Sequence, residues 1–251
     1  MQAEDRVSGP NIDAARIDAA RIDGPLNPAA VLWDMDGTLV DSEKVWTISL
    51  ADTARWLGGE LSAEAREAMV GSNMGRSLAL MFDDLGVEAD PGRMAEAARY
   101  LTDRTGELFA AGLVWRPGAL EALRMVRAAG WPTALVTNTL RTLTEKALDS
   151  IGREHFTVTV CGDEVPRGKP DPDPYLRAAE LLGVTPEACL AVEDSPTGAL
   201  AAERAGCAVL VVPCDVPVPA GPRRVQRTSL LGLTADDIEI SYAQARGERA
   251  A

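Results

Sequence analysis

Histidine is almost missing from this chain, which has a single one, His155, among 251 residues. A catalytic triad built on histidine, a histidine–aspartate relay or a metal site with several histidines would all depend on this one side chain. His155 lies in GREHFTVTV, between a helical pattern and a strand pattern, a position typical of a helix-end or core histidine. Any catalysis is therefore expected to use carboxylates, hydroxyls and lysine.

Cysteine pairs and long apolar runs are also missing. The chain has 4 cysteines and no CxxC pair, and three of them lie in or beside apolar runs, which favours buried thiols in a reducing cytoplasm over disulfides or zinc. No apolar run approaches the roughly 18 residues that a membrane span needs. The segment MQAEDRVSGP has early acidic residues and no apolar core, so we expect no secretory signal there. These features predict a cytoplasmic protein.

Basic residues are also few compared with acidic ones. The sequence has 25 lysines and arginines against 38 aspartates and glutamates, for a formal net charge of −13. A surface this acidic repels nucleic acid and anionic membrane, so we expect neither as a partner. A small phosphorylated molecule can still bind where a few basic groups are focused.

A short apolar run at residues 29–34 is followed, after residue 113, by further apolar runs that alternate with amphipathic helical patterns. The expected strands are AAVLWD (29–34), WPTALVTN (131–138), FTVTVCGDE (156–164), ACLAVEDS (188–195) and CAVLVVP (207–213). Continuous apolar strands separated by helices are typical of a parallel sheet covered on both faces. The pattern predicts an α/β protein with a Rossmann-like, doubly wound parallel sheet.

One long block interrupts that alternation. Residues 43–113 show only helical spacing, punctuated by glycines, and we interpret them as an all-helical cap domain inserted into a core of residues 28–42 and 114–235. Residues 1–27, which contain a repeated IDAAR, are expected to form a mobile N-terminal tail, and residues 236–251 a loose C-terminal tail.

Polar side chains follow four of the expected strands. They are Asp34, Asp36 and Thr38 after the first, with Gly37 among them, Thr137 and Asn138 after the second, Lys169 in the loop after the third, and Glu193, Asp194 and Ser195 after the fourth. In open parallel sheets ligands bind beyond the carboxyl ends of the strands, so these groups should converge at one edge.

The convergent groups have the chemistry of a phosphate site. Asp34 and Asp36 are two residues apart and should flank the same space. Glu193 and Asp194 approach the same edge, and their mutual repulsion would be relieved by a divalent cation, for which hard oxygen ligands favour Mg²⁺. With Lys169 adding a positive charge, one aspartate can attack a phosphorus atom while the second transfers protons.

Simpler interpretations exist for each of these residues. Asp34 and Asp36 could be a helix cap and a turn residue, and Glu193 and Asp194 could cap the helix that begins at Pro196. The recurrence of polar groups after four strands favours the functional interpretation.

The motifs DMDGT, LVTN, GKPDPDPY and VEDS, in this order, resemble the four motifs of the haloacid dehalogenase superfamily over about residues 28–213. The resemblance implies that Asp34 is the nucleophile and Asp36 the general acid and base. It further implies a Mg²⁺ ion bound by Asp34, the backbone carbonyl of Asp36 and Asp194, with Glu193 close by. The helical block resembles the small cap of the subfamily that includes phosphoglycolate phosphatase and β-phosphoglucomutase.

The remaining binding residues follow from the same resemblance and from position. Thr137, Asn138 and Lys169 are expected to hold the phosphoryl group. In the cap, Arg76 either reaches a second anionic group of the substrate or is an ordinary surface arginine, and Trp46 either lines the pocket or, as we favour, belongs to the core.

The expected activity is therefore Mg²⁺-dependent hydrolysis of a small phosphorylated metabolite through an aspartyl phosphate. The alternative is a β-phosphoglucomutase-like phosphomutase, but such mutases carry a histidine in the early cap helix, about where this chain has Trp46. Dehalogenation needs no second aspartate, so Asp36 argues against it. A catalytically silent scaffold is not supported, because every core motif residue is present.

Overall fold

The computed structural model describes residues 27–69, 72, 74–214 and 216–247. Within these residues the strands form one parallel six-stranded sheet in the order β3-β2-β1-β4-β5-β6. The strands are β1 (Ala30–Trp33), β2 (Thr133–Val136), β3 (Val158–Val160), β4 (Cys189–Glu193), β5 (Ala208–Val211) and β6 (Arg224–Gln226). The order reverses between β1 and β4, which makes the carboxyl ends of these two neighbours the place where a ligand crevice forms.

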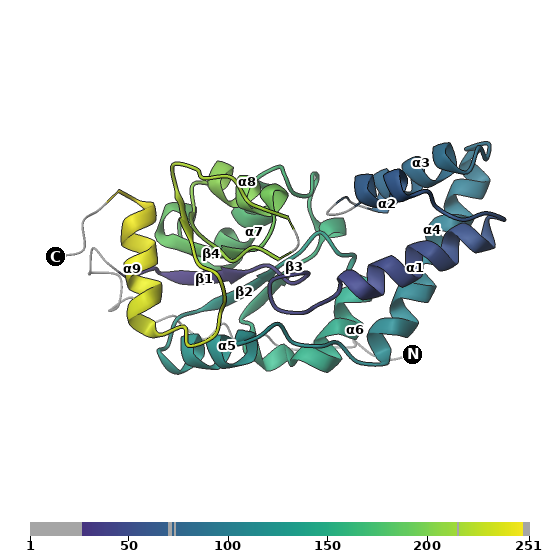
Figure 1. The fold of residues 1–251 in the computed structure, drawn as a ribbon. Helices are drawn as coiled ribbons and strands as arrows, with labels where there is room; N and C mark the ends of the chain where they lie inside the picture. The colour runs from purple at the N-terminus through teal and green to yellow at the C-terminus, as the bar shows by residue number, and fades with distance from the viewer. Residues whose placement is uncertain (1–26, 70–71, 73, 215, 248–251) are drawn as a thin grey trace, which may run out of the picture.

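Helices cover both faces of the sheet, as Figure 1 shows. They are α5 (Ala119–Ala128), α6 (Arg141–Ile151), α7 (Asp173–Leu182), α8 (Pro196–Ala205) and α9 (Ala235–Ala245), with short 3-10 turns η2 (Arg153–His155), η3 (Gly162–Glu164) and η4 (Pro186–Ala188). Val31 and Trp33 of β1 pack in the cluster that contains α5, α6 and α9, whereas Ala30 and Leu32 pack in the cluster that contains α7 and α8. The alternation of side chains along a strand explains why β1 must be apolar throughout.

The cap consists of α1 (Glu43–Trp56), α2 (Ala63–Met69), α3 (Met74–Asp84) and α4 (Pro91–Ala110). Its apolar residues form a cluster of their own, in which Met81, Phe82 and Leu101 are buried. Asp90 caps α4 by accepting hydrogen bonds from the backbone of Gly92 and Arg93. The predicted helical block thus folds around a separate small core, to one side of the sheet (Figure 1).

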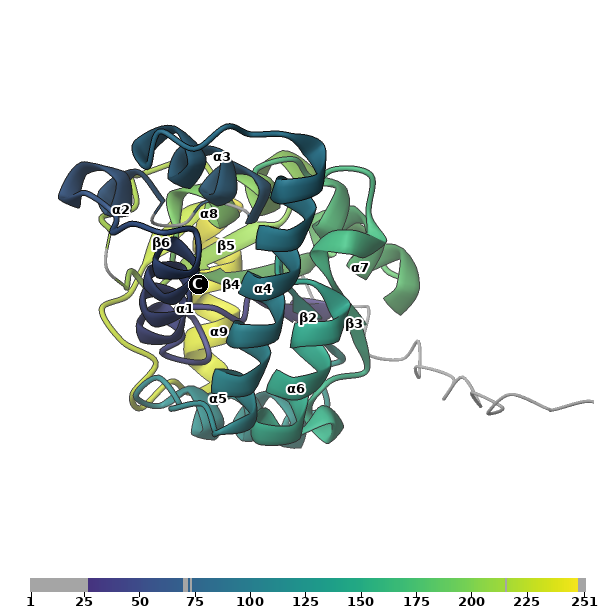
Figure 2. The same cartoon turned by 90° about the vertical axis from the view of Figure 1, so that its right-hand side faces the viewer.

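Two paired segments join the cap to the core. Val40 and Trp115 form an antiparallel bridge, and the Asp41 backbone N–H donates to the Val114 carbonyl at 2.8 Å. Figure 2 shows α4 standing beside α6 of the core, where Lys146 lies so close to Gly106 that a β-carbon there would clash with the lysine nitrogen. The cap is therefore held at its linkers and along one helix.

The expected loose segment over residues 236–251 is wrong for its described part. Residues Ala235–Ala245 form α9, which begins with a capping box between Thr234 and Asp237. Ile238 and Tyr242 are buried on the sheet side of the helix, and the Tyr242 hydroxyl donates to the Glu187 carbonyl at 3.1 Å. The i, i+4 spacing of these two apolar residues is what docks the helix.

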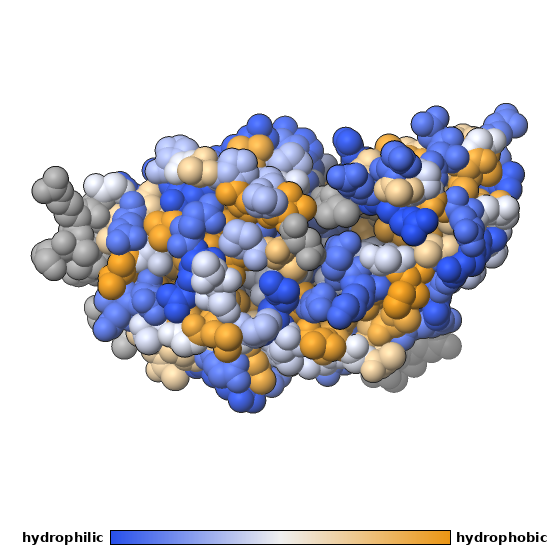
Figure 3. Space-filling model, viewed as in Figure 1, coloured by the Kyte–Doolittle hydropathy of each residue, from blue (hydrophilic) through white to orange (hydrophobic). Residues whose placement is uncertain are grey.

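The expected N-terminal tail, apart from residue 27, lies outside the described residues. The strand β6 was not expected from the sequence, because Val225 is its one apolar residue. On the face seen in Figure 3, hydrophilic side chains cover much of the core and the cap, and hydrophobic side chains form small separate groups. No helix among the described residues has the length and apolar character needed to cross a membrane.

Candidate active site

A cavity of about 700 Å³ lies between the cap and the carboxyl edge of the sheet. The core contributes Asp34 and Asp36 after β1, Thr137 and Asn138 after β2, Lys169 before α7 and Asp194 after β4. The cap contributes residues of α1, α2, α3 and α4. The structure thus brings together at one place the groups that the sequence predicts at four separate strand ends.

Lys169 is buried at the floor of this cavity between two carboxylates. Its Nζ lies 2.6 Å from Asp34 Oδ1 and 2.6 Å from Glu193 Oε1. Burial by itself would lower the pKa of Lys169, but the charges of Asp34 and Glu193 outweigh burial and hold that pKa above its ordinary value. Lys169 is therefore a fixed positive charge, as a phosphate site requires.

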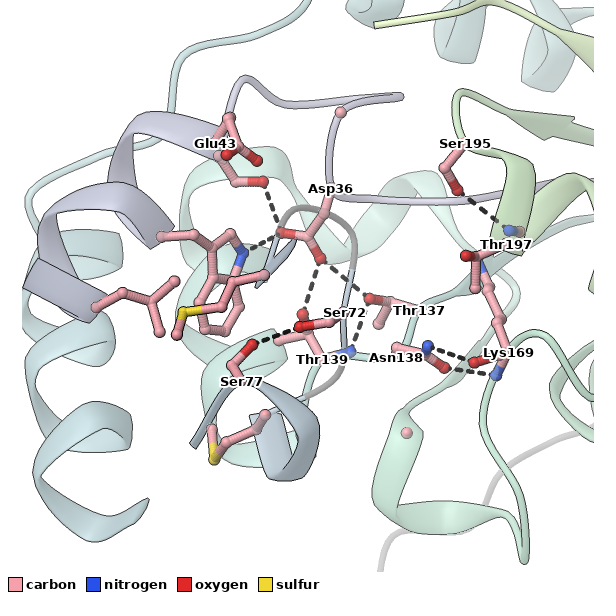
Figure 4. Close-up of a pocket in the computed structure, with 18 of the residues that line it drawn as sticks. Asp36, Glu43, Ser72, Ser77, Thr137, Asn138, Thr139, Lys169, Ser195 and Thr197 are labelled. Atoms are coloured by element: carbon pink, nitrogen blue, oxygen red, sulfur yellow. Dashed lines mark hydrogen bonds between the residues drawn. The ribbon is translucent and has the colours of Figure 1, made fainter. Parts of the chain in front are cut away.

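The Lys169 loop is held from both sides. The Asn138 side chain accepts a hydrogen bond from the Lys169 N–H at 2.8 Å and donates to the Lys169 carbonyl at 3.1 Å, as Figure 4 shows. Gly168 is required beside it, because a β-carbon there would come 2.6 Å from Asn138 Oδ1. In this structure Asn138 positions Lys169, and its expected contact with substrate stays a prediction.

The carboxylates of Asp34, Glu193 and Asp194 form a group suited to a metal ion. One oxygen from each lies within 4.8 Å of the others, and Asp34 Oδ2 is buried with no hydrogen-bond partner among the described residues. Burial, opposed by Lys169 and reinforced by neighbouring carboxylates, raises the pKa of Asp34 to about 7. Burial and the charges of Asp34 and Glu193 raise the pKa of Asp194 to about 9.

These raised pKa values have a clear physical meaning. Three carboxylates that share a buried space disfavour one another's charged form, and the single charge of Lys169 offsets only part of this repulsion. An all-oxygen set with an unused buried acceptor fits Mg²⁺ better than zinc. The residues present therefore fit the expected ion.

Within this group Glu193 has other partners. It is fully buried, its Oε1 accepts from both Lys169 and the Tyr175 hydroxyl, and its Oε2 lies 3.5 Å from the Ser195 hydroxyl. Glu193 therefore also holds Lys169 in place, and its expected contact with the metal stays a prediction. Tyr175 has no signal in the sequence beyond its place at the end of GKPDPDPY.

Gly37 allows the Asp194 carboxylate to approach the first strand loop. Its φ is +84°, and a β-carbon there would overlap Asp194 Oδ2. The neighbouring Thr38 hydroxyl donates to Asp194 Oδ1 at 3.4 Å. A glycine is therefore needed at this position both for its backbone conformation and for space.

The Asp36 carboxylate accepts four hydrogen bonds from neighbouring side chains. Oδ1 accepts from the Ser42 hydroxyl at 2.7 Å and from Trp46 Nε1 at 3.2 Å. Oδ2 accepts from the Thr139 hydroxyl at 2.8 Å and from the Thr137 hydroxyl at 3.2 Å (Figure 4). The side chain of Asp36 is thus not among the three grouped carboxylates, and the carbonyl ligand that the resemblance assigns to Asp36 stays a prediction.

Sequence reasoning did not identify all of the residues that surround Asp36 or line the cavity. Ser42 and Thr139 were not singled out, although Thr139 follows Thr137 at strand spacing. Trp46 packs against the core, as we favoured, and also lines the cavity. Arg76 is exposed on α3 and is not brought into the described lining, whereas Arg66 and Glu67 of α2 are. Helical phase decides which α3 residues face inward, and Gly75 and Ser77 are among those that do.

Comparison with known proteins agrees with this fold and site. The haloacid dehalogenase-like hydrolase family matches residues 28–206, and the chain belongs to this family of enzymes. It is 34% identical over 192 residues to hexitol phosphatase A of Escherichia coli, a match that covers 74% of this chain and 84% of the relative. It is 33% identical over 198 residues to phosphoglycolate phosphatase of Thiobacillus denitrificans, covering 75% of this chain and 85% of the relative.

A solved structure gives the same result. The crystal structure of CbbY from Rhodobacter sphaeroides in complex with phosphate superposes with a TM-score of 0.73 at 30% identity and covers 82% of this chain and 96% of that one. The parallel sheet with a helical cap that the sequence predicts is thus confirmed, as is the family resemblance. The names of these relatives differ in substrate, so they do not decide what this chain acts on.

Proposed function

We propose that the protein is a Mg²⁺-dependent phosphatase that hydrolyses a small phosphorylated metabolite through an aspartyl-phosphate intermediate. The observation that carries this proposal is Asp34, a buried carboxylate at the floor of a cavity. One of its oxygens is fixed by Lys169 and the other has no partner among the described residues. The phosphatase names of the relatives support the same reaction class.

The proposed reaction has two steps, and each combines a phosphoryl transfer with a proton transfer. An Asp34 oxygen attacks the phosphorus atom, the ester P–O bond breaks, and Asp36 gives a proton to the departing alcohol oxygen. Water then attacks the phosphorus of the aspartyl phosphate while Asp36 takes a proton from it, and inorganic phosphate leaves with Asp34 restored. The donors from Ser42, Trp46 and Thr139 hold the Asp36 carboxylate in one orientation for both steps.

The surrounding residues stabilise charge. When bound, Mg²⁺ would be held by Asp34 and Asp194 and would neutralise phosphoryl charge. Lys169 adds its positive charge from the floor of the site, and we propose that the Thr137 hydroxyl, which donates to Asp36 in this structure, turns to a phosphoryl oxygen when substrate is bound. We do not extend this role to Arg76, whose exposed side chain lies outside the described lining.

The test is phosphate release from p-nitrophenyl phosphate with and without metal. We expect turnover with MgCl₂, loss of at least about 100-fold in EDTA, and recovery when Mg²⁺ is restored, because the metal neutralises charge that the acidic site cannot. Full activity in EDTA would contradict the proposed metal site. Rapid conversion of β-glucose 1-phosphate to glucose 6-phosphate in the presence of glucose 1,6-bisphosphate would favour the phosphomutase instead.

Trp46→Phe should lower kcat by about tenfold while KM changes by less than about twofold. The change removes the indole donor to Asp36 and keeps a ring against Phe109, whose centroid lies 6.3 Å from that of Trp46. The matched control is Trp56→Phe on the same helix, because Trp56 is 44% exposed and stacks on Tyr100 away from the cavity lining. An unchanged kcat, or a change confined to KM, would show that Trp46 only lines the pocket.

The cytoplasm is the proposed location. The structure supports it through Cys161, Cys189 and Cys207, which are buried thiols rather than disulfides. The proposed ligand is a small phosphorylated metabolite, and the net charge of −13 argues against nucleic acid and anionic membranes.

A further inference from the structure

The cap side of the cavity is short of positive charge. Among the described residues that line the whole cavity, the cations are Arg66 and Lys169, against five carboxylates. Two of these carboxylates, Glu43 in the first turn of α1 and Glu67 in α2, come from the cap. The part of the cavity that would receive the leaving group therefore carries more negative than positive side chains.

Both cations already have partners. Arg66 donates to the Leu61 carbonyl from Nε at 3.1 Å and from Nη2 at 2.6 Å, which ties its guanidinium to the backbone before α2. Lys169 is held between Asp34 and Glu193 on the floor. A carboxylate or a second phosphate on the leaving group would meet one cap cation, Arg66, whose guanidinium is tied to the Leu61 carbonyl, and two cap glutamates, so it would lose its hydration beside a surface of net negative charge.

The cap side of the cavity also suits hydroxyl groups on a substrate. Thr47, Ser72 and Ser77 line it as hydroxyls, with Ser72 and Ser77 hydrogen-bonded to each other at 2.5 Å (Figure 4). Carboxylates accept strong hydrogen bonds from alcohols, so Glu67 can bind the hydroxyls of a substrate that carries no charge there.

Apolar side chains fill the space between these polar groups. They are Trp46, Leu50, Leu61, Met69, Met74 and Leu101. A wall that combines apolar surface with a few polar groups matches the C–H faces and hydroxyls of a carbohydrate chain. The cavity volume of about 700 Å³ is in the upper half of the usual range for small-molecule sites, roughly 300–1,000 Å³, and so has room for a leaving group larger than a two-carbon acid.

We infer that the leaving group is an uncharged polyhydroxylated chain, so that the substrate is a polyol or sugar monophosphate rather than a phosphorylated acid or a bisphosphate. This inference rests on the proposed phosphatase function and narrows it. Relatives named for a hexitol and for phosphoglycolate are 34% and 33% identical to the chain, so similarity does not choose between them. The excess of negative side chains on the cap side of the cavity favours the substrate with an uncharged leaving group.

The test compares kcat/KM for sorbitol 6-phosphate and glucose 6-phosphate with kcat/KM for 2-phosphoglycolate and ribulose 1,5-bisphosphate. We expect at least about a tenfold preference for the first pair. A preference for phosphoglycolate or for the bisphosphate overturns the inference. Turnover of p-nitrophenyl phosphate reports the phosphatase activity separately, so the substrate inference can fail while that activity stands; its absence would overturn both.

Two variants of one residue sharpen the result. Glu67→Gln should lower kcat/KM for the preferred polyol phosphate about three- to tenfold, because it weakens the acceptor. Glu67→Lys should shift the ratio of phosphoglycolate to polyol phosphate turnover about tenfold or more toward the acid. Glu64→Gln is the matched control, since Glu64 is exposed on the same helix outside the cavity lining. An unchanged ratio in Glu67→Lys would overturn the role of the cap charge.

Discussion

Replacing Asp34 with asparagine should reduce turnover of p-nitrophenyl phosphate by about 10⁴-fold or more. The amide oxygen cannot act as the nucleophile at phosphorus, and the substitution also removes one charge from the metal group. Size and shape are almost unchanged, so the asparagine side chain fits in the same buried position. The measurement is kcat/KM with saturating MgCl₂, and turnover within tenfold of wild type would contradict the nucleophile assignment.

A stability measurement separates loss of chemistry from loss of fold. Because burial raises the pKa of Asp34 from its ordinary 3.8 to about 7, the folded metal-free protein binds more protons than the unfolded chain between these values. The free energy of unfolding of metal-free wild type therefore falls as pH rises through this range, and Asp34→Asn should lack that contribution. At pH 8 without metal, the melting temperature of the variant should be no lower than that of wild type. Mg²⁺ should raise the melting temperature of the variant less than it raises that of wild type.

Asp41→Asn is the matched control for this experiment. Asp41 lies on the same loop, forms a surface ion pair with Lys44 at 3.7 Å and does not line the cavity. An exposed pair of this kind contributes little, so activity and melting temperature should both remain near those of wild type.

The sheet was predictable because its strands have no solvent-facing side. A strand buried on both faces must be apolar at every position, as Ala30–Trp33 and Ala208–Val211 are, and such runs stand out in a sequence. The edge strand Arg224–Gln226 has no such requirement and therefore leaves little signal. Helix α9 was missed because its apolar face is narrow and its position depends on packing against β5.

The core of the site was predictable for a related reason. Parallel strands place their carboxyl ends at one edge, so Asp34, Lys169 and Asp194 had to meet once the strand order was right. The contacts from the cap were not predictable in the same way. Whether Trp46 or Arg76 points into the cavity depends on how α1 and α3 are rotated, and that rotation is set by cap packing rather than by a motif.

Lys169→Met should lower both stability and activity strongly. It leaves Asp34 Oδ1 and Glu193 Oε1 without the cation that lies 2.6 Å from each. Breaking a buried ion pair costs about 3–5 kcal/mol, which for a protein of this size lowers the melting temperature by about 10 °C. Loss of a charge beside the phosphoryl group should lower kcat by about 10³-fold. Lys44→Met is the control, because the Lys44 side chain is 84% exposed.

The double variant Lys169→Met, Glu193→Gln shows which of the two effects belongs to catalysis. Neutralising Glu193 removes one of the two carboxylates that the first substitution leaves unpaired, and the glutamine amide oxygen can still accept from the Tyr175 hydroxyl as the Glu193 carboxylate does. About half of the lost melting temperature should return, since the remaining unpaired charge is that of Asp34. Activity should stay about 10³-fold down, because no cation faces the phosphoryl group from the floor of the site. If activity returned together with stability, Lys169 would be a structural residue, and the charge that the proposed mechanism assigns to it would have to come from the metal alone.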